Sequence, residues 1–138
     1  MNISKKINTG IIKCTFTDEE GDIVAYFTIN PTDVNLLKRI EEVSGYFESR
    51  KNNAPILASV EDLVEYNKEL EKKIDYLLGY NASESIFNNI TATTINPDGE
   101  IFAILVFEFI NEKVRPEMQK RKQNMIAAAD KYTEKYKK

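Results

Sequence analysis

The run Ile-Phe-Ala-Ile-Leu-Val-Phe-Glu-Phe-Ile, residues 101–110, decides the fold of this chain. Nine of its ten residues are apolar, so a helix over this run is apolar around most of its circumference. Such a helix must be buried on several sides, either within one chain or between subunits. Glu108 alone interrupts the run, and we expect it to mark the solvent side of the helix or to pair with Lys113 or Arg115.

The residues on either side of this run predict where the helix begins and where its character changes. Asn96-Pro97-Asp98-Gly99 is typical of a helix start. Pro116 removes a backbone donor, so we expect a kink or a restart near Arg115. Beyond it only a thin apolar stripe remains, which should stay mobile until something covers it. The stripe consists of Met118, Met125, Ile126, Ala129, Tyr132 and Tyr136.

The net charge of −3 conceals a difference between the two ends of the chain. Residues 111–138 hold nine Lys and Arg against four acids, whereas residues 1–110 hold ten against eighteen. A basic tail on an acidic body can bind an acidic partner, can bind the body of a neighbouring copy, or can simply be solvated.

The first thirty residues predict a β-hairpin. Apolar and polar residues alternate over 12–17 and again over 23–29, which indicates two strands with one buried face. Gly21 supplies the positive φ that the intervening turn requires. Cys14, the one cysteine, occupies an apolar position of the first strand, so we expect a packed thiol and no intrachain disulfide.

Two helices are expected next. Asn30-Pro31-Thr32-Asp33 predicts a start capped by Asn30 or Thr32, with the helix running to about Ser49 and a loop at residues 51–55. Ser59 and Asp62 form a capping-box-like start to the second helix, which should stop at Gly79.

The second helix carries a seam of alternating three- and four-residue steps. This seam can pack on the first helix or on another copy of the chain, in which case Asn67 would set the register of a dimer. The seam residues are Val60, Leu63, Asn67, Leu70, Ile74 and Leu77. A short helical turn at 83–87 should then place Ile86 and Phe87 in the core.

The sequence therefore predicts an α+β fold, mostly helical, with an N-terminal β-hairpin, three main α-helices and an extended C-terminal helix. We expect a single domain over residues 1–138. Its parts are the hairpin (1–30), a helical body (31–115) and a basic C-terminal helical tail (116–138).

The chain lacks the usual catalytic constellations. Without histidine and with one cysteine it can form neither a Cys/His metal cluster nor a Ser-His-Asp triad, and it contains no Walker or dinucleotide-binding glycine motif. Glu100, Glu108 and Glu112 have helical spacing, but acids at such steps are common on exposed faces. We expect a protein that is not an enzyme, with no metal and no cofactor.

The same reading predicts a cytoplasmic protein without membrane contact. The apolar run over 101–110 is half of the ~20 residues that a membrane-spanning helix needs. The N-terminus lacks the apolar core of a signal peptide.

Nucleic-acid binding is the alternative function. A modest basic and aromatic strip consists of Lys120-Arg121-Lys122 followed by Lys131, Lys135, Lys137 and Lys138, with Tyr132 and Tyr136 interleaved. An isoelectric point near 5.2 and the interspersed acids argue against it. The alternative is a small phage-encoded regulator that binds nucleic acid through its C-terminal helix.

Three segments together resemble a known family. Asp75-Tyr76-Leu77-Leu78-Gly79, Ser85-Ile86-Phe87-Asn88 and Lys131-Tyr132-Thr133-Glu134-Lys135-Tyr136, placed around a buried helix and a basic tail, resemble the small tail assembly chaperones of long-tailed phages. The resemblance covers roughly residues 75–138. It implies a non-enzymatic protein that binds the tape measure protein, keeps it soluble and helps recruit tail tube subunits.

The resemblance also implies where such a protein acts and which residues it uses. It would work as a homo-oligomer in the host cytoplasm and be absent from the mature virion; a structural component would instead remain in finished particles. Truncation at Pro116 should leave the body folded and abolish assembly. Tape-measure helices would lie on the apolar run and the seam, through Phe102, Phe107, Phe109 and Asn67, and an acidic tube subunit or neighbour would bind Lys120, Arg121, Lys122, Tyr132, Lys135 and Tyr136.

Overall fold

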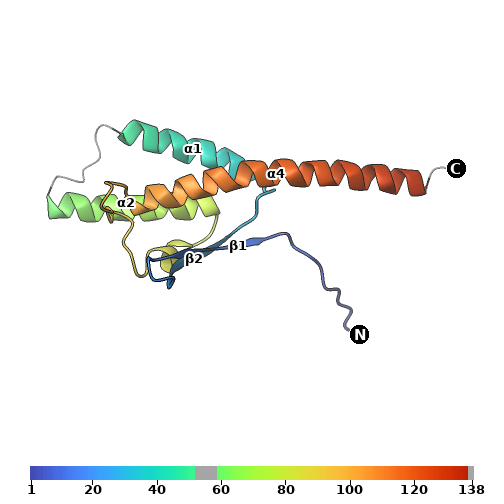
Figure 1. The fold of residues 1–138 in the computed structure, drawn as a ribbon, viewed down its shortest axis with the longest axis horizontal. Coiled ribbons are helices and arrows are strands. Elements are labelled where there is room, and N and C mark those ends of the chain that lie inside the picture. The colour runs from blue at the N-terminus through green and yellow to red at the C-terminus, as the bar shows by residue number, and fades with distance from the viewer. Residues whose placement is uncertain (52–58, 137–138) are drawn as a thin grey trace.

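The computed structural model describes residues 1–51 and 59–136 and shows the predicted α+β fold. A two-stranded β-hairpin precedes three long helices and one short one, and the last helix extends far beyond the rest (Figure 1). The elements are β1 (Ile12–Thr17), β2 (Ile23–Ile29), α1 (Val34–Arg50), α2 (Val60–Leu78), α3 (Ser83–Ile86) and α4 (Phe102–Lys135).

The hairpin forms as the alternation predicts. β1 and β2 are antiparallel, with Cys14 opposite Phe27, and both of these side chains are buried. Asp18 closes the turn, since its Oδ1 accepts from the backbone N–H of Asp22 at 3.0 Å. Gly21 adopts the expected positive φ, 87°. One prediction differs. The register shifts between Phe16 and Thr17, so Ile23 pairs with Thr17 and stays 60% exposed instead of joining Ala25 and Phe27 on the buried face.

The start of α1 lies later than the sequence predicts. Asp33 is the cap, accepting from the backbone N–H of Asn35 at 3.0 Å. The prediction of a cap from Asn30 or Thr32 is therefore wrong, because the Asn30 carboxamide oxygen accepts from the backbone N–H of Thr32 and closes a turn before the helix. The helix buries the predicted stripe, with Leu36, Ile40 and Val43 in the core and Leu37 and Phe47 packed against it.

The predicted ends of α2 are confirmed. Ser59 Oγ accepts from the backbone N–H of Asp62 at 3.2 Å, and Gly79 ends the helix with φ 80°. Along the seam, Leu70, Ile74 and Leu77 are fully buried, whereas Val60 is 77% exposed. The seam thus packs inside the chain over its C-terminal half. The predicted loop at 51–55 lies outside the described residues except for Lys51.

The segment before α4 corrects a second prediction. The short helix α3 places Ile86 and Phe87 in the core as expected. However, Asn96-Pro97-Asp98-Gly99 is not a helix start, because the Asn96 side chain accepts from the N–H groups of Asp98 and Glu100 and closes a turn. The helix begins only at Phe102, with no side-chain cap.

α4 is one continuous helix of 34 residues with Pro116 inside it. The predicted restart near Arg115 is wrong. Its first half lies against the helical body, and its second half projects alone from one end (Figure 1). Among the described residues, no helix is both long and apolar enough to cross a membrane.

Candidate interaction surface on the last helix

The first half of α4 is held by aromatic packing. Phe16 of β1 lies 5.2 Å from Phe109 and 6.0 Å from Phe102, centroid to centroid, in T-shaped edge contacts. Phe107 is 6% exposed and packs on Phe47 of α1 at 5.2 Å. The three phenylalanines expected to contact a partner are therefore occupied by the chain's own hairpin and helices. Their role in the structure is to fix α4 in the body.

Asn67 is also engaged within the chain. Its Oδ1 accepts from both the backbone N–H and the hydroxyl of Thr93, each at 3.2 Å, and its Nδ2 donates to Glu71. These bonds tie α2 to the loop before α4. Packing within one chain, one of the two alternatives for the seam, holds over its C-terminal half, where Leu70, Ile74 and Leu77 are buried.

One stripe of side chains runs the length of α4. At 3.6 residues per turn, its members all lie within about 60° of one line along the helix. In the body section of the stripe these are Ala103, Phe107, Ile110 and Val114, and in the tail section they are Met118, Met125, Ala129, Tyr132 and Tyr136. The same helix face that forms the core therefore continues beyond the body.

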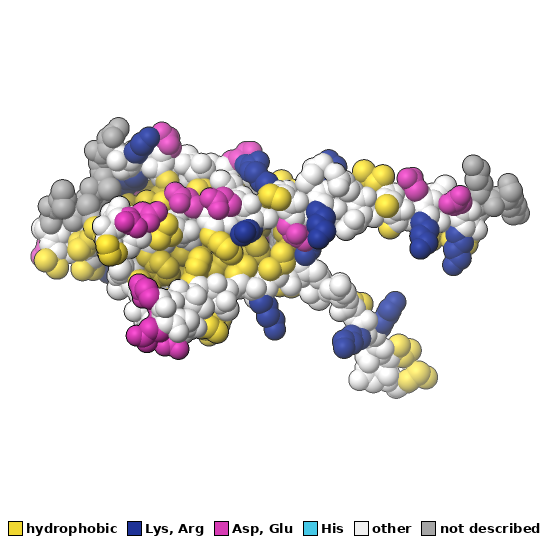
Figure 2. Space-filling view, in the orientation of Figure 1, with side chains coloured by type: hydrophobic (Ala, Val, Ile, Leu, Met, Phe, Trp, Pro, Cys, Tyr) yellow, Lys and Arg dark blue, Asp and Glu magenta, His cyan; other side chains and the backbone are white. Residues whose placement is uncertain are grey.

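The two sections differ sharply in exposure. Ile110 and Val114 are 0% exposed, whereas Met125 is 62%, Tyr132 65% and Tyr136 63% exposed. Ile126, which the sequence places in the stripe, lies to one side of it by helix geometry and is 52% exposed. Figure 2 shows the projecting helix with hydrophobic and basic side chains at its surface and no other segment over it. Within residues 1–51 and 59–136, nothing covers the outer part of the tail section.

Basic side chains flank the tail section of the stripe. By helix geometry Lys122 lies on one side of it and Lys131 and Lys135 on the other, while Asp130 and Glu134 lie on the opposite face. These lysines are exposed, as is Lys120. The stripe ends in a pair of tyrosine rings, Tyr132 and Tyr136, 4.8 Å apart, and Lys135 Nζ lies 5.7 Å from the centre of the Tyr136 ring.

Arg121 differs from its basic neighbours because it is used within the chain. Its Nη1 donates to the carbonyl of Gly10 at 2.6 Å, and its Nε donates to Glu117 at 3.0 Å. The first bond ties the segment before β1 to the last helix. Nothing in the sequence links positions so far apart, so the sequence places Arg121 among the partner-binding residues and does not reveal this bond.

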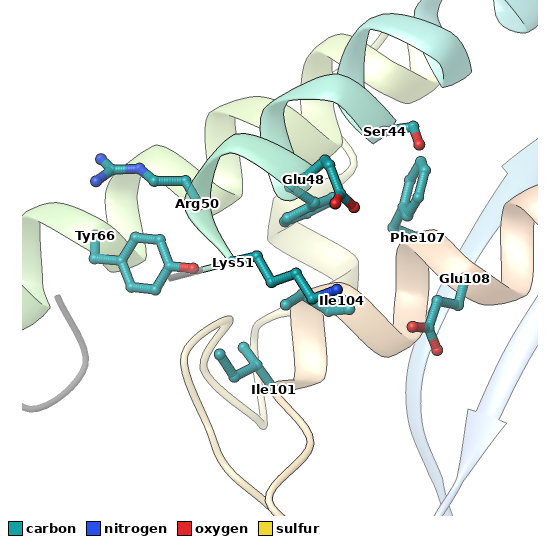
Figure 3. A pocket seen from close by; sticks show the side chains of 10 residues that line it. Ser44, Glu48, Arg50, Lys51, Tyr66, Ile101, Ile104, Phe107 and Glu108 are labelled. Atoms are coloured by element: carbon teal, nitrogen blue, oxygen red, sulfur yellow. The ribbon is translucent and has the colours of Figure 1, made fainter. Parts of the chain in front are cut away.

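A cleft of about 350 Å³ lies between α1 and α4 (Figure 3). Ile104 and Phe107 of α4 line this cleft together with Tyr66 of α2. Glu108 also lines the cleft and is exposed, which agrees with the prediction that it marks the solvent side of the helix. Burial raises the pKa of the Tyr66 hydroxyl above its ordinary value. The residues that line the cleft include neither a histidine nor a cysteine.

The cysteine and the acidic side chains are the other groups with possible chemical roles. Cys14 is buried, and burial raises the pKa of its thiol, so the thiolate is disfavoured. Among the described residues, no three acidic or cysteine side chains converge as a metal site would require. The most distinctive feature of the surface is therefore the uncovered tail section with its basic flanks.

Comparison with known proteins adds no relationship to this geometry. No family model matches the chain, and no curated protein or solved structure matches it either.

Proposed function

We propose that the protein is a non-enzymatic tail assembly chaperone of a long-tailed phage, which binds the tape measure protein and helps recruit tail tube subunits. The observation that supports it best is the α4 stripe, which passes from the core into solvent and leaves Met125, Tyr132 and Tyr136 uncovered. Because residues 75–138 resemble that family, we expect helices of the tape measure protein to be the partner of this surface.

The tail section suits an amphipathic helix as its partner. Residues 118–136 span about 27 Å at 1.5 Å per residue, enough for several turns of a second helix to lie along the stripe. The partner's apolar side would cover Met125 and Tyr132, and its acidic flanks would meet Lys122 and Lys131. An interface of this length is small, which favours release when tube subunits arrive.

The structure moves the proposed contact away from the phenylalanines of the apolar run. Phe107 is only 6% exposed and already packs on Phe47, so it offers a partner little free surface. In this proposal Phe102, Phe107 and Phe109 hold α4 on the body, and the tail section binds the partner. Many copies would coat one tape measure protein in the host cytoplasm and leave before the virion is complete.

The test is co-expression with a fragment of the tape measure protein encoded nearby, followed by size-exclusion chromatography with light scattering. A soluble complex should form with the native chain and be lost in the variant Met125→Gln/Tyr132→Gln. The matched control is Ala127→Gln/Glu134→Gln, since these exposed residues lie on the helix face opposite the stripe. Equal binding by both variants would contradict the assignment, as would a native chain that ignores the fragment.

The second candidate, a nucleic-acid-binding regulator, is favoured by the exposure of Tyr132 and Tyr136 beside Lys131 and Lys135. Stacking of bases on exposed aromatic rings combined with phosphate contacts is the usual mode for single strands. Such binding should weaken steeply as salt is raised. A chain that ignores the tape measure fragment but binds DNA with this salt dependence is the regulator.

A further inference from the structure

The outer edge of β2 is closed by side chains. The Tyr80 hydroxyl accepts from the backbone N–H of Thr28 at 2.8 Å, and Ser85 Oγ donates to the Tyr26 carbonyl at 2.6 Å. Asn89 Nδ2 donates to the Val24 carbonyl at 3.2 Å. The main-chain groups of β2 that point away from β1 are therefore satisfied by the segment around α3.

These contacts also fix the orientation of β1. The backbone N–H and C=O groups of Tyr26 and Thr28 point away from β1. The residues opposite them, Thr15 and Lys13, therefore exchange no backbone hydrogen bonds with β2. Their N–H and C=O groups point to the other edge of the sheet. None of the described residues bonds to them there. The sheet thus has one closed edge, on β2, and one open edge, on β1.

An extended segment with matching properties precedes β1. Residues 1–11, which we call the arm, form no helix or strand and project away from the body (Figure 1). Ile3 is 85% exposed, Ile7 68% and Ile11 50%. Their spacing of four places all three on one side of an extended chain. The arm therefore has the alternation of a strand but lacks a sheet to pair with.

The outer face of the hairpin is apolar where an added strand would lie. Ile23 and Tyr26 are about as exposed as the arm isoleucines, at 60% and 61%, and they line a hollow of about 460 Å³ on this face. Thr15 lies on the same face as Tyr26. A strand paired to β1 through its odd-numbered residues would turn Ile3 and Ile7 towards this face.

The charges of the two segments are complementary. The turn after β1 holds four acids, Asp18, Glu19, Glu20 and Asp22, and the arm holds Lys5 and Lys6. Figure 2 shows acidic side chains at the hairpin turn and basic ones on the arm. An arm that runs antiparallel to β1 points its early residues towards that turn. With Lys5 opposite Thr17, the lysines reach the acids, and Ile7 lies opposite Thr15.

We propose that the arm of one copy pairs antiparallel with β1 of a second copy and forms a third strand of its sheet. The arm cannot reach its own β1 edge without reversing direction at Gly10. The bond from Arg121 to the Gly10 carbonyl instead holds the arm on a path away from the sheet. Donation to a neighbour satisfies the open edge of β1 and buries the arm isoleucines. This inference is independent of the proposed function.

The first experiment blocks the edge without touching the hairpin ladder. Thr15→Pro removes an N–H that points away from β2, whereas Thr15→Val keeps it. By light scattering the native chain and Thr15→Val should have twice the monomer mass or more. Thr15→Pro and a chain lacking residues 1–9 should have the monomer mass, with unchanged helix content by circular dichroism. A monomeric native chain, or a folded Thr15→Pro variant that associates normally, overturns the proposal.

The second experiment locates the contact. In a Cys14→Ser background, Ile7→Cys is placed in one chain and Thr15→Cys in a longer, tagged chain, because paired strand positions satisfy disulfide geometry. Oxidation of the mixture should give a disulfide between the two chains. Moving the first cysteine to Ser4, whose side chain points to the other side of the arm, should give none. A third variant carries both Ile7→Cys and Thr15→Cys in one chain. If no disulfide joins the mixed chains and this variant forms one within itself, the arm folds back on its own sheet and the proposal is overturned.

Discussion

The two halves of α4 reach the same conformation by different means. Its first half is rich in aromatic and β-branched residues, which are indifferent helix formers, and it is helical because the body buries it. Its second half is exposed and consists largely of Lys, Gln, Glu, Met and Ala, which favour a helix by themselves. The comparison teaches that continuity of a helix does not indicate continuity of packing: one half holds the fold together, and the other is available for a partner.

The largest expected difference between the two halves of α4 is in how much an isoleucine-to-alanine substitution lowers the free energy of unfolding. Ile110→Ala should lower the free energy of unfolding by about 2–5 kcal/mol, because it leaves a cavity at a fully buried position. Ile126→Ala, on the exposed half, should change it by about 0.5 kcal/mol or less. Urea unfolding monitored by circular dichroism measures both. Equal losses would mean that the tail is packed against something in solution.

The sequence predicts those elements whose signals are local and unopposed. The hairpin follows from alternation over 12–17 and 23–29, and α2 follows from a single serine cap and a single glycine stop. The body section of the α4 stripe follows from an apolar run that can only be buried. The fold class depends on these signals, which is why it is correct.

The errors arise where several residues compete for one role or where a contact is not local. Asn30, Thr32 and Asp33 can all cap a helix, and the spacing alone does not show which one does. Asn96 has the side chain of a cap but satisfies its own turn. The bond between Arg121 and Gly10 joins the two ends of the chain, and no periodicity carries that information.

Pro116 lies where the two halves meet, so its replacement should change how strongly they are coupled. Proline inside a helix removes one backbone bond and costs about 3 kcal/mol relative to alanine, partly offset by its smaller unfolded-state entropy. We expect Pro116→Ala to stabilise α4 by about 1–2 kcal/mol. Hydrogen exchange should then slow over residues 117–135. Exchange in the tail as fast as in the native chain would show that the proline does not limit its stability.

A smaller effect should follow from releasing the arm. Arg121→Gln removes the donor to the Gly10 carbonyl, a part-buried bond of the kind that contributes about 1 kcal/mol. The free energy of unfolding should fall by roughly that amount or less, and proteolysis within residues 1–10 should become faster. Lys122→Gln is the control, because this neighbour is exposed and forms no ion pair among the described residues. Identical cleavage in both variants would contradict an anchoring role.

The smallest expected effect tests whether ring geometry or burial determines how much an aromatic pair contributes to stability. Tyr132 and Tyr136 lie 4.8 Å apart and Phe47 and Phe107 5.2 Å, so separation alone would rank the tyrosine pair at least as high. Yet the tyrosines are mostly exposed in the described chain, where such a pair four residues apart contributes only about 0.2–0.5 kcal/mol to local helix stability. Tyr132→Ala should therefore leave global unfolding unchanged and only speed hydrogen exchange in the last turns of α4. A loss of more than about 1 kcal/mol in the isolated protein would mean that a second copy already covers these rings, because only burial gives an aromatic pair that value.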